Sequence, residues 1–254
     1  MVKIAVVLPS RGKVFSETAA ELLRELGPYE HQIYYSHGRP IPDCFNVPTE
    51  TALADPAITH VLYCEDDMII PRGILRKMVA IDYPAVALDY PFKADNEATA
   101  LRDPHGFAFY TGTGFLLVMR QLLEKLPKPI FRANIAWDTM IDRQRVITFW
   151  PRELAEGAGY GLQDVNFGLT LYANSLPILV MGEAGQRKLV EGKQVELTKV
   201  LRNNVTKNAN PPDRDKFLAA MERLTGVRVL TQIPSNIVYI DGQAHLTGGD
   251  YEII

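Results

Sequence analysis

Three consecutive acidic residues, Glu65, Asp66 and Asp67, stand between two apolar runs in the segment HVLYCEDDMIIPRGIL. The run before them predicts a buried strand, so we expect the acids at the carboxyl end of that strand. In open parallel sheets, ligands bind outside the carboxyl ends of the strands. Carboxylates that are held close together repel one another, and a cation usually relieves that repulsion.

The chemistry that suits such a group is the binding of a hard cation. Carboxylate oxygens favour Mg²⁺ or Mn²⁺, and an ion held in this way can also bind a diphosphate. The pattern therefore indicates metal-assisted transfer from a nucleotide-activated donor. The alternative is an ordinary solvated acidic loop, or a cap for the helix expected after Pro71.

Strands and helices that would position these acids alternate along the chain. We expect strands at 2–8, 31–35, 59–63, 85–88 and 177–181, and helices at 47–53, 71–81, 121–126 and 164–174. A further helix is expected from the capping residue Ser16 to a stop at Gly27 and Pro28. Residues 107–119 predict β structure with a glycine interruption, and a helix (214–225) and strands (227–230, 236–240) are expected in the tail. This alternation predicts an α/β fold whose mostly parallel sheet is covered on both faces.

The composition is that of a folded globular protein. The chain has 254 residues, of which 47% are apolar and 22% charged, and its net charge of -3 gives no general attraction to nucleic acids or anionic membranes. The two cysteines, Cys44 and Cys64, have neither metal-type spacing nor the pattern of a disulfide framework, which favours a reducing cytoplasm. No segment has the length of apolar sequence that a transmembrane helix needs, and no signal peptide is expected.

Four segments occur in an order that resembles one enzyme family. VVLPSRG resembles the nucleotide-binding loop of that family, and HVLYCEDDMIIPRGIL resembles its Asp-x-Asp (DXD) motif. TGTGFLLVMRQLLEKL resembles its glycine-rich strand, and GYGLQDVNFGLTLYANSLPILV resembles its Glu-Asp helix. The family is that of GT-A fold glycosyltransferases of the family 2 type, within the nucleotide-diphospho-sugar transferase superfamily. The resemblance implies a GT-A type α/β/α sandwich with a mostly parallel central sheet. It implies a catalytic domain at 1–195, and we expect residues 196–254 to form a small C-terminal extension of helix and strand packed on it.

The same resemblance implies a metal site. Asp67 would contact Mn²⁺ or Mg²⁺ directly, with Glu65 and Asp66 near the ribose, the phosphate or metal-bound water. Gln186 stands where many of these enzymes have a histidine ligand, so we expect its amide oxygen to serve, while His105 and His245 remain candidates for that position.

The resemblance also assigns residues to the nucleotide and the donor sugar. Pro9, Ser10 and Arg11 would meet the nucleotide, and the Arg11 guanidinium suits a phosphate or a base, although a surface arginine in a turn is the alternative. Asn46 would point to the nucleotide or form a helix N-cap. The glycine-rich turn would let the backbone approach the donor sugar, and a β-bulge without a ligand is its alternative. That turn consists of Gly112, Thr113 and Gly114.

Asp164 matches the acid of the Glu-Asp motif, and Gln163 replaces its glutamate. In inverting family members this acid removes a proton from the acceptor hydroxyl. The alternative is that Asp164 only caps its helix.

We therefore expect a metal-dependent glycosyltransferase that transfers a sugar from a UDP- or GDP-type nucleoside diphosphate sugar to an acceptor hydroxyl with inversion. Proteins, lipids, glycans and modified bases remain open as acceptors. The alternatives are a sugar-phosphate nucleotidyltransferase and a non-catalytic module that binds nucleotide sugars. A dinucleotide oxidoreductase fits less well, because no G-x-G-x-x-G follows the first strand. The tail is a candidate for making a homo-oligomer, for covering the site or for binding the acceptor.

Overall fold

A computed structural model describes most of the first 132 residues and separate segments of the remainder. The described residues are 2–10, 12–92, 97–102, 107–132, 138–141, 144–146, 163–173, 176–182, 187–190, 192–196, 237–240 and 243–246. The expected helix at 214–225 and the expected strand at 227–230 lie outside them.

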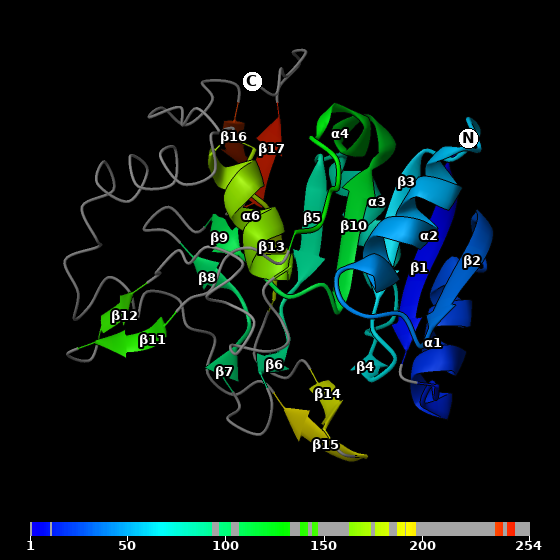
Figure 1. Cartoon of the computed structure of the whole chain (residues 1–254), viewed down its shortest axis with the longest axis horizontal. Coiled ribbons are helices and arrows are strands. Elements are labelled where there is room, and N and C mark those ends of the chain that lie inside the picture. Colours follow the sequence, from blue (N-terminus) through cyan, green and yellow to red (C-terminus); the bar gives the residue numbers. More distant parts are fainter. Residues whose placement is uncertain are drawn as a thin grey trace.

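Six strands in the described part of the chain form one central sheet, in the order β13-β5-β10-β3-β1-β2 (Figure 1). These strands are β1 (Lys3–Ser10), β2 (Glu30–His37), β3 (His60–Cys64), β5 (Ala85–Leu88), β10 (Phe115–Met119) and β13 (Leu179–Met181). Strand β10 is antiparallel to both of its neighbours, and all the other pairings are parallel. The predicted α/β fold with a mostly parallel central sheet is thus confirmed.

Helices cover both faces of this sheet, which makes a three-layer arrangement (Figure 1). Side chains alternate between the two faces of a strand, and β1 shows this directly. Ile4, Val6 and Leu8 belong to one buried cluster, while Ala5 and Val7 belong to the other. The first cluster includes side chains of α1 (Ser16–Leu26) and α3 (Ile74–Ile81), and the second includes side chains of α2 (Asp43–Leu53), α4 (Arg120–Lys125) and α6 (Gln163–Ala173).

Short strand pairs surround the central sheet. The most important is β4 (Met68–Ile69), which pairs antiparallel with β14 (Arg187–Val190), and β14 pairs in turn with β15 (Lys193–Glu196). The β4–β14 pairing brings a segment about 120 residues away next to the acidic residues. The remaining pairs are β6 (Pro91–Phe92) with β7 (Glu97–Ala98), β8 (Leu101–Arg102) with β9 (Ala108–Tyr110), β11 (Asp138–Ile141) with β12 (Gln144–Val146), and β16 (Ile237–Ile240) with β17 (Gln243–Leu246).

Several helix starts differ from the prediction. Ser16 is the first residue of α1 rather than its N-cap, and its hydroxyl donates to Glu17 instead of to the backbone. Helix α2 begins at Asp43, four residues before the predicted start. Helix α3 begins at Ile74 rather than at Pro71, because Gly73 has a left-handed backbone conformation with φ 73°.

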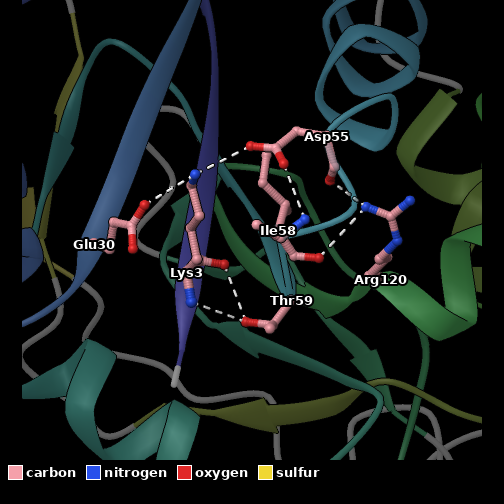
Figure 2. A network of polar contacts seen from close by, with 7 residues as sticks. Lys3, Glu30, Asp55, Ile58, Thr59 and Arg120 are labelled. Atoms are coloured by element: carbon pink, nitrogen blue, oxygen red, sulfur yellow. Dashed lines mark hydrogen bonds and ion pairs between the residues drawn. The ribbon is translucent and has the colours of Figure 1, made fainter.

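A polar network ties together the elements around the amino end of β1 (Figure 2). The Lys3 ammonium lies 2.9 Å from Glu30 Oε1 and 3.1 Å from Asp55 Oδ2. The Arg120 guanidinium donates to the carbonyl oxygens of Leu53, Asp55 and Ile58. One arginine at the start of α4 thus links the end of α2 to the loop that leads into β3.

Candidate active site

The acidic residues follow the last residue of β3, as predicted, and hydrogen bonds from three other segments hold their backbone. The Glu65 amide donates to Gly114 O at 2.9 Å. The carbonyl oxygens of Asp66 and Asp67 accept from the amides of Phe15 at 3.0 Å and Leu189 at 2.8 Å. The loop before α1, the turn before β10 and strand β14 therefore meet at the carboxyl end of β3.

A lysine occupies the space between two of these carboxylates. Lys188 lies opposite Met68 in the β4–β14 pair. Its Nζ donates to Glu65 Oε2 at 2.8 Å and forms an ion pair with Asp67 Oδ1 at 3.2 Å. The lysine side chain is only 15% exposed, and its ammonium lies 4.8 Å from the centre of the Tyr90 ring. These contacts compensate the cost of burying the three charges, since an unpaired buried charge is strongly unfavourable.

The ionisation of this group follows from its burial and its charges. Burial raises the pKa of Asp67 to about 6, against the opposing effect of Lys188. For Lys188, burial lowers the pKa, but the negative charges of Glu65 and Asp67 outweigh it, and the pKa is raised above its ordinary value. The lysine is therefore charged throughout the neutral range.

Tyr90 fills the space beside the glycine turn. A Cβ on Gly112 would lie 1.9 Å from the Tyr90 hydroxyl oxygen, and one on Gly114 would lie 2.6 Å from the ring and 2.8 Å from Met68 Sδ. The hydroxyl accepts a hydrogen bond from Gly114 N at 3.0 Å. The absence of side chains at these glycines thus accommodates Tyr90, and their predicted role at the donor sugar stays a prediction. Thr113 donates to Glu65 Oε1 at 3.3 Å, which adds a second contact to that carboxylate.

The position of Tyr90 depends on the buried acid before it. Asp89 follows β5 and is 0% exposed. Its Oδ1 accepts hydrogen bonds from the amides of Tyr90, Thr99 and Ala100 at 3.0 to 3.2 Å, and from the Thr99 hydroxyl at 3.2 Å. This carboxylate therefore holds the turn that presents the Tyr90 ring to the lysine.

Asp164 lies in the first turn of α6, and its Oδ1 accepts a hydrogen bond from Val165 N at 2.8 Å. Burial raises the pKa of Asp164 to about 7, and the negative charge of Glu65 adds to the rise. The charge of Lys188 acts in the opposite direction. Asp164 therefore lies within electrostatic reach of the ion-paired group, and its roles as general base or as helix cap both stay predictions. Gln163 beside it is 4% exposed.

Ser10 and Asn46, which were predicted to meet the nucleotide, have hydrogen bonds within the protein. Ser10 donates to Lys13 O at 2.8 Å and accepts from Gly12 N at 3.0 Å, so its hydroxyl closes the loop after β1, while Pro9 is the next to last residue of that strand. Asn46 is buried inside α2 and is not its N-cap, which is Pro42. Its amide exchanges two hydrogen bonds of 2.9 Å with the backbone of Phe131, which explains the residue without a ligand. Arg11 lies outside the described residues.

The predicted divalent ion does not fit the donor set as these side chains are arranged. Glu65 Oε2 and Asp67 Oδ1 both face the Lys188 ammonium, and a cation placed between them would meet its positive charge. Within the described part of the chain, no group of three His, Cys, Asp or Glu side chains is gathered for a metal. Gln186 and His105 lie outside that part, and His245 lies on β17, in a separate strand pair. The ion remains a prediction.

Comparisons with known proteins bear on the fold. No protein-family model matches the chain, and no curated protein matches it. The solved structure of A197 from STIV is similar, with a TM-score of 0.50 and 16% identity over 80% of this chain and 97% of that one. A 4-diphosphocytidyl-2C-methyl-D-erythritol synthase from Anaerococcus prevotii matches 48% of this chain and 73% of its own, at 13% identity and a TM-score of 0.29, which is too low to support an argument. The likeness to A197 supports the α/β fold alone.

Two residues of the site were not predicted from the sequence. Tyr90 follows the carboxyl end of β5, and the general position of ligand sites in parallel sheets could have drawn attention to it. Lys188 stands in the polar segment QRKLVEGK, where nothing distinguishes it from its charged neighbours. The pairing of β14 with β4 brings that lysine next to the acidic residues.

Proposed function

We propose that this protein is a glycosyltransferase that moves a sugar from a nucleoside diphosphate sugar to an acceptor hydroxyl. The observation that supports it best is the ion-paired group of Glu65, Asp67 and Lys188 at the carboxyl end of β3, near enough to Asp164 for the charges of Glu65 and Lys188 to affect its pKa. Ligands of parallel α/β sheets bind at this end. The order of the four sequence segments described above supports the same reaction class.

In this proposal Asp164 acts as the general base. Its carboxylate accepts the proton of the acceptor hydroxyl while the hydroxyl oxygen forms a bond to the anomeric carbon of the sugar. The bond between that carbon and the diphosphate oxygen breaks, the diphosphate leaves with the electron pair, and the configuration is inverted. A base is most effective when its pKa lies near the working pH, and a pKa of about 7 meets this condition.

The partners of this reaction are a UDP- or GDP-type sugar donor and an acceptor hydroxyl on a protein, lipid, glycan or modified base. No helix in the described part of the chain combines the length and apolar character that crossing a bilayer requires. Cys44 and Cys64 are buried free thiols, and we propose the cytoplasm as the compartment of the enzyme.

Donor turnover tests the proposal. The full chain is incubated with UDP- and GDP-sugars and mixed acceptors, with Mn²⁺ and separately with EDTA, and release of UDP or GDP is measured by chromatography. We expect release by the wild type and at least a hundredfold slower release by Asp164→Asn, with donor affinity within a few-fold of wild type. Absence of donor binding under every condition would contradict the proposal.

The same samples separate the alternatives. A sugar-phosphate nucleotidyltransferase would release pyrophosphate from a nucleoside triphosphate and a sugar phosphate. A binding module would bind the nucleotide sugar without consuming it, even with acceptors present.

A further inference from the structure

We propose that the Lys188 ammonium is the resident cation of the Glu65–Asp67 pair, so that the site excludes a divalent ion and binds its donor without one. This inference rests on the proposed function, and it names the group that takes the place of the metal. The metal predicted from the family resemblance would need the same two carboxylates.

The first step rests on the distances between the Lys188 nitrogen and the two carboxylates. A single nitrogen lies 2.8 Å from Glu65 Oε2 and 3.2 Å from Asp67 Oδ1, so it stands where an ion bridging the two carboxylates would stand. Both acids are mostly enclosed, with side chains 27% and 24% exposed, which weakens the screening of their charges by salt. A second cation at these oxygens would be repelled by the first at a separation of a few ångströms.

The second step concerns the surroundings of Lys188, which contain groups that favour a positive charge at this position. The Tyr90 ring lies 4.8 Å from the ammonium, and ring faces attract cations. Hydrogen bonds from four donors to Asp89 Oδ1 hold the turn that positions this ring. The main chain of β14 is fixed as well, since the neighbouring Leu189 amide donates to Asp67 O at 2.8 Å.

The third step concerns the donor. An ammonium has three N–H donors. The contacts with Glu65 and Asp67 use at most two of them, and among the described residues no other hydrogen bond from this nitrogen is seen. Within the described part of the chain, one N–H is therefore left for an oxygen of a diphosphate. Lysine binds phosphate as a point charge in many nucleotide sites.

Direct titration with Mn²⁺ tests the inference without relying on catalysis. Binding is measured by calorimetry for the wild-type full chain and for Lys188→Met, which removes the charge but keeps most of the stem. We expect Lys188→Met to bind Mn²⁺ at least tenfold more tightly than wild type, and we expect Asp67→Asn to abolish the gain in the double variant. Wild-type binding as tight as that of Lys188→Met would overturn the inference.

Two further variants keep the result interpretable. Lys188→Arg retains a cation and is expected to bind Mn²⁺ as weakly as wild type, which attributes any gain in Lys188→Met to the loss of the charge. Lys193→Met removes an exposed lysine from the same hairpin and is expected to change nothing. Tight Mn²⁺ binding by Lys188→Arg would count against a resident cation.

Donor affinity in EDTA gives the second measurement. We expect UDP- or GDP-sugar to bind wild type with affinities within about twofold in EDTA and in Mn²⁺, and at least tenfold more weakly to Lys188→Met. Binding only in the presence of Mn²⁺ would overturn this inference and leave the proposed function intact. No donor binding in either condition would contradict the proposed function, while the Mn²⁺ titration would still decide the role of Lys188.

Discussion

At the scale of single residues, the ionisation of Asp164 determines whether the proposed reaction can run. Its carboxylate must be unprotonated to accept the hydroxyl proton, and its pKa is raised to about 7 by burial and by the charge of Glu65. We expect kcat/KM to rise about tenfold per pH unit below pH 7 and to level off above it. A pH profile of nucleotide release from 5 to 9 checks this, and a flat profile would contradict the role of Asp164 as base.

The same raised pKa predicts an effect on stability. Because the folded pKa of about 7 exceeds the ordinary carboxyl value near 3.9, the folded state binds more protons than the unfolded state between these pH values, and the free energy of unfolding falls as pH rises. Asn cannot ionise, and its side-chain oxygen can still accept from Val165 N. We expect Asp164→Asn to be more stable than wild type by on the order of 2 kcal/mol at pH 8 and nearly equal at pH 4.

Urea denaturation at both pH values measures this difference. A variant that loses activity but gains stability identifies a residue kept for function at a cost in stability. Equal stabilities at pH 8 would indicate that Asp164 bears no charge cost in the folded protein.

At the scale of elements, the glycine turn and the turn after β5 are fitted to one another. A Cβ on Gly112 would overlap the Tyr90 hydroxyl oxygen at 1.9 Å, whereas the nearest ring carbon lies at 2.8 Å. We expect Gly112→Ala to lower the free energy of unfolding by about 3 kcal/mol, because the added carbon would force a buried side chain to move.

A double-mutant cycle with Tyr90→Phe checks the cause. Tyr90→Phe alone is expected to cost about 1 to 2 kcal/mol, since Gly114 N loses its acceptor. In that background Gly112→Ala is expected to cost at least 1 kcal/mol less, because the atom in closest contact is gone. Additive effects would mean that the hydroxyl is not the source of the strain.

Elements with strong local signals were predictable from the sequence, and elements set by distant pairing were not. Apolar β-branched runs predicted β1, β3 and β5 within two residues, since buried parallel strands need such runs at every position. Strand β4 has two residues, and β14 has four, of which two are charged and two apolar, so neither has a periodic pattern. The acids were located correctly because a strand precedes them, but their partner Lys188 was missed because only the β4–β14 pairing brings it near.

At the scale of the whole molecule, polar groups at opposite ends of the sheet differ in their role. The Lys3, Asp55 and Arg120 network lies around the amino end of β1 and satisfies backbone carbonyls (Figure 2). The candidate site lies beyond the carboxyl end of β3, next to β4 and β14 (Figure 1). Substitutions of the charged residues around the amino end of β1 are expected to change the free energy of unfolding but not the affinity for the donor, since the sheet separates them from the site.

Arg120 provides the test of this separation. Arg120→Met removes the donors to the carbonyls of Leu53, Asp55 and Ile58, and we expect it to lower the free energy of unfolding by about 2 kcal/mol, since part-buried acceptors lose their partners. Arg120→Lys is expected to recover less than half of the loss, because one ammonium cannot replace the planar guanidinium fork. Urea denaturation measures both variants, and donor affinity at a temperature where they are folded is expected to stay within twofold of wild type. A fall in affinity that parallels the loss of stability would show that this end of the sheet is coupled to the site, contrary to the expected separation.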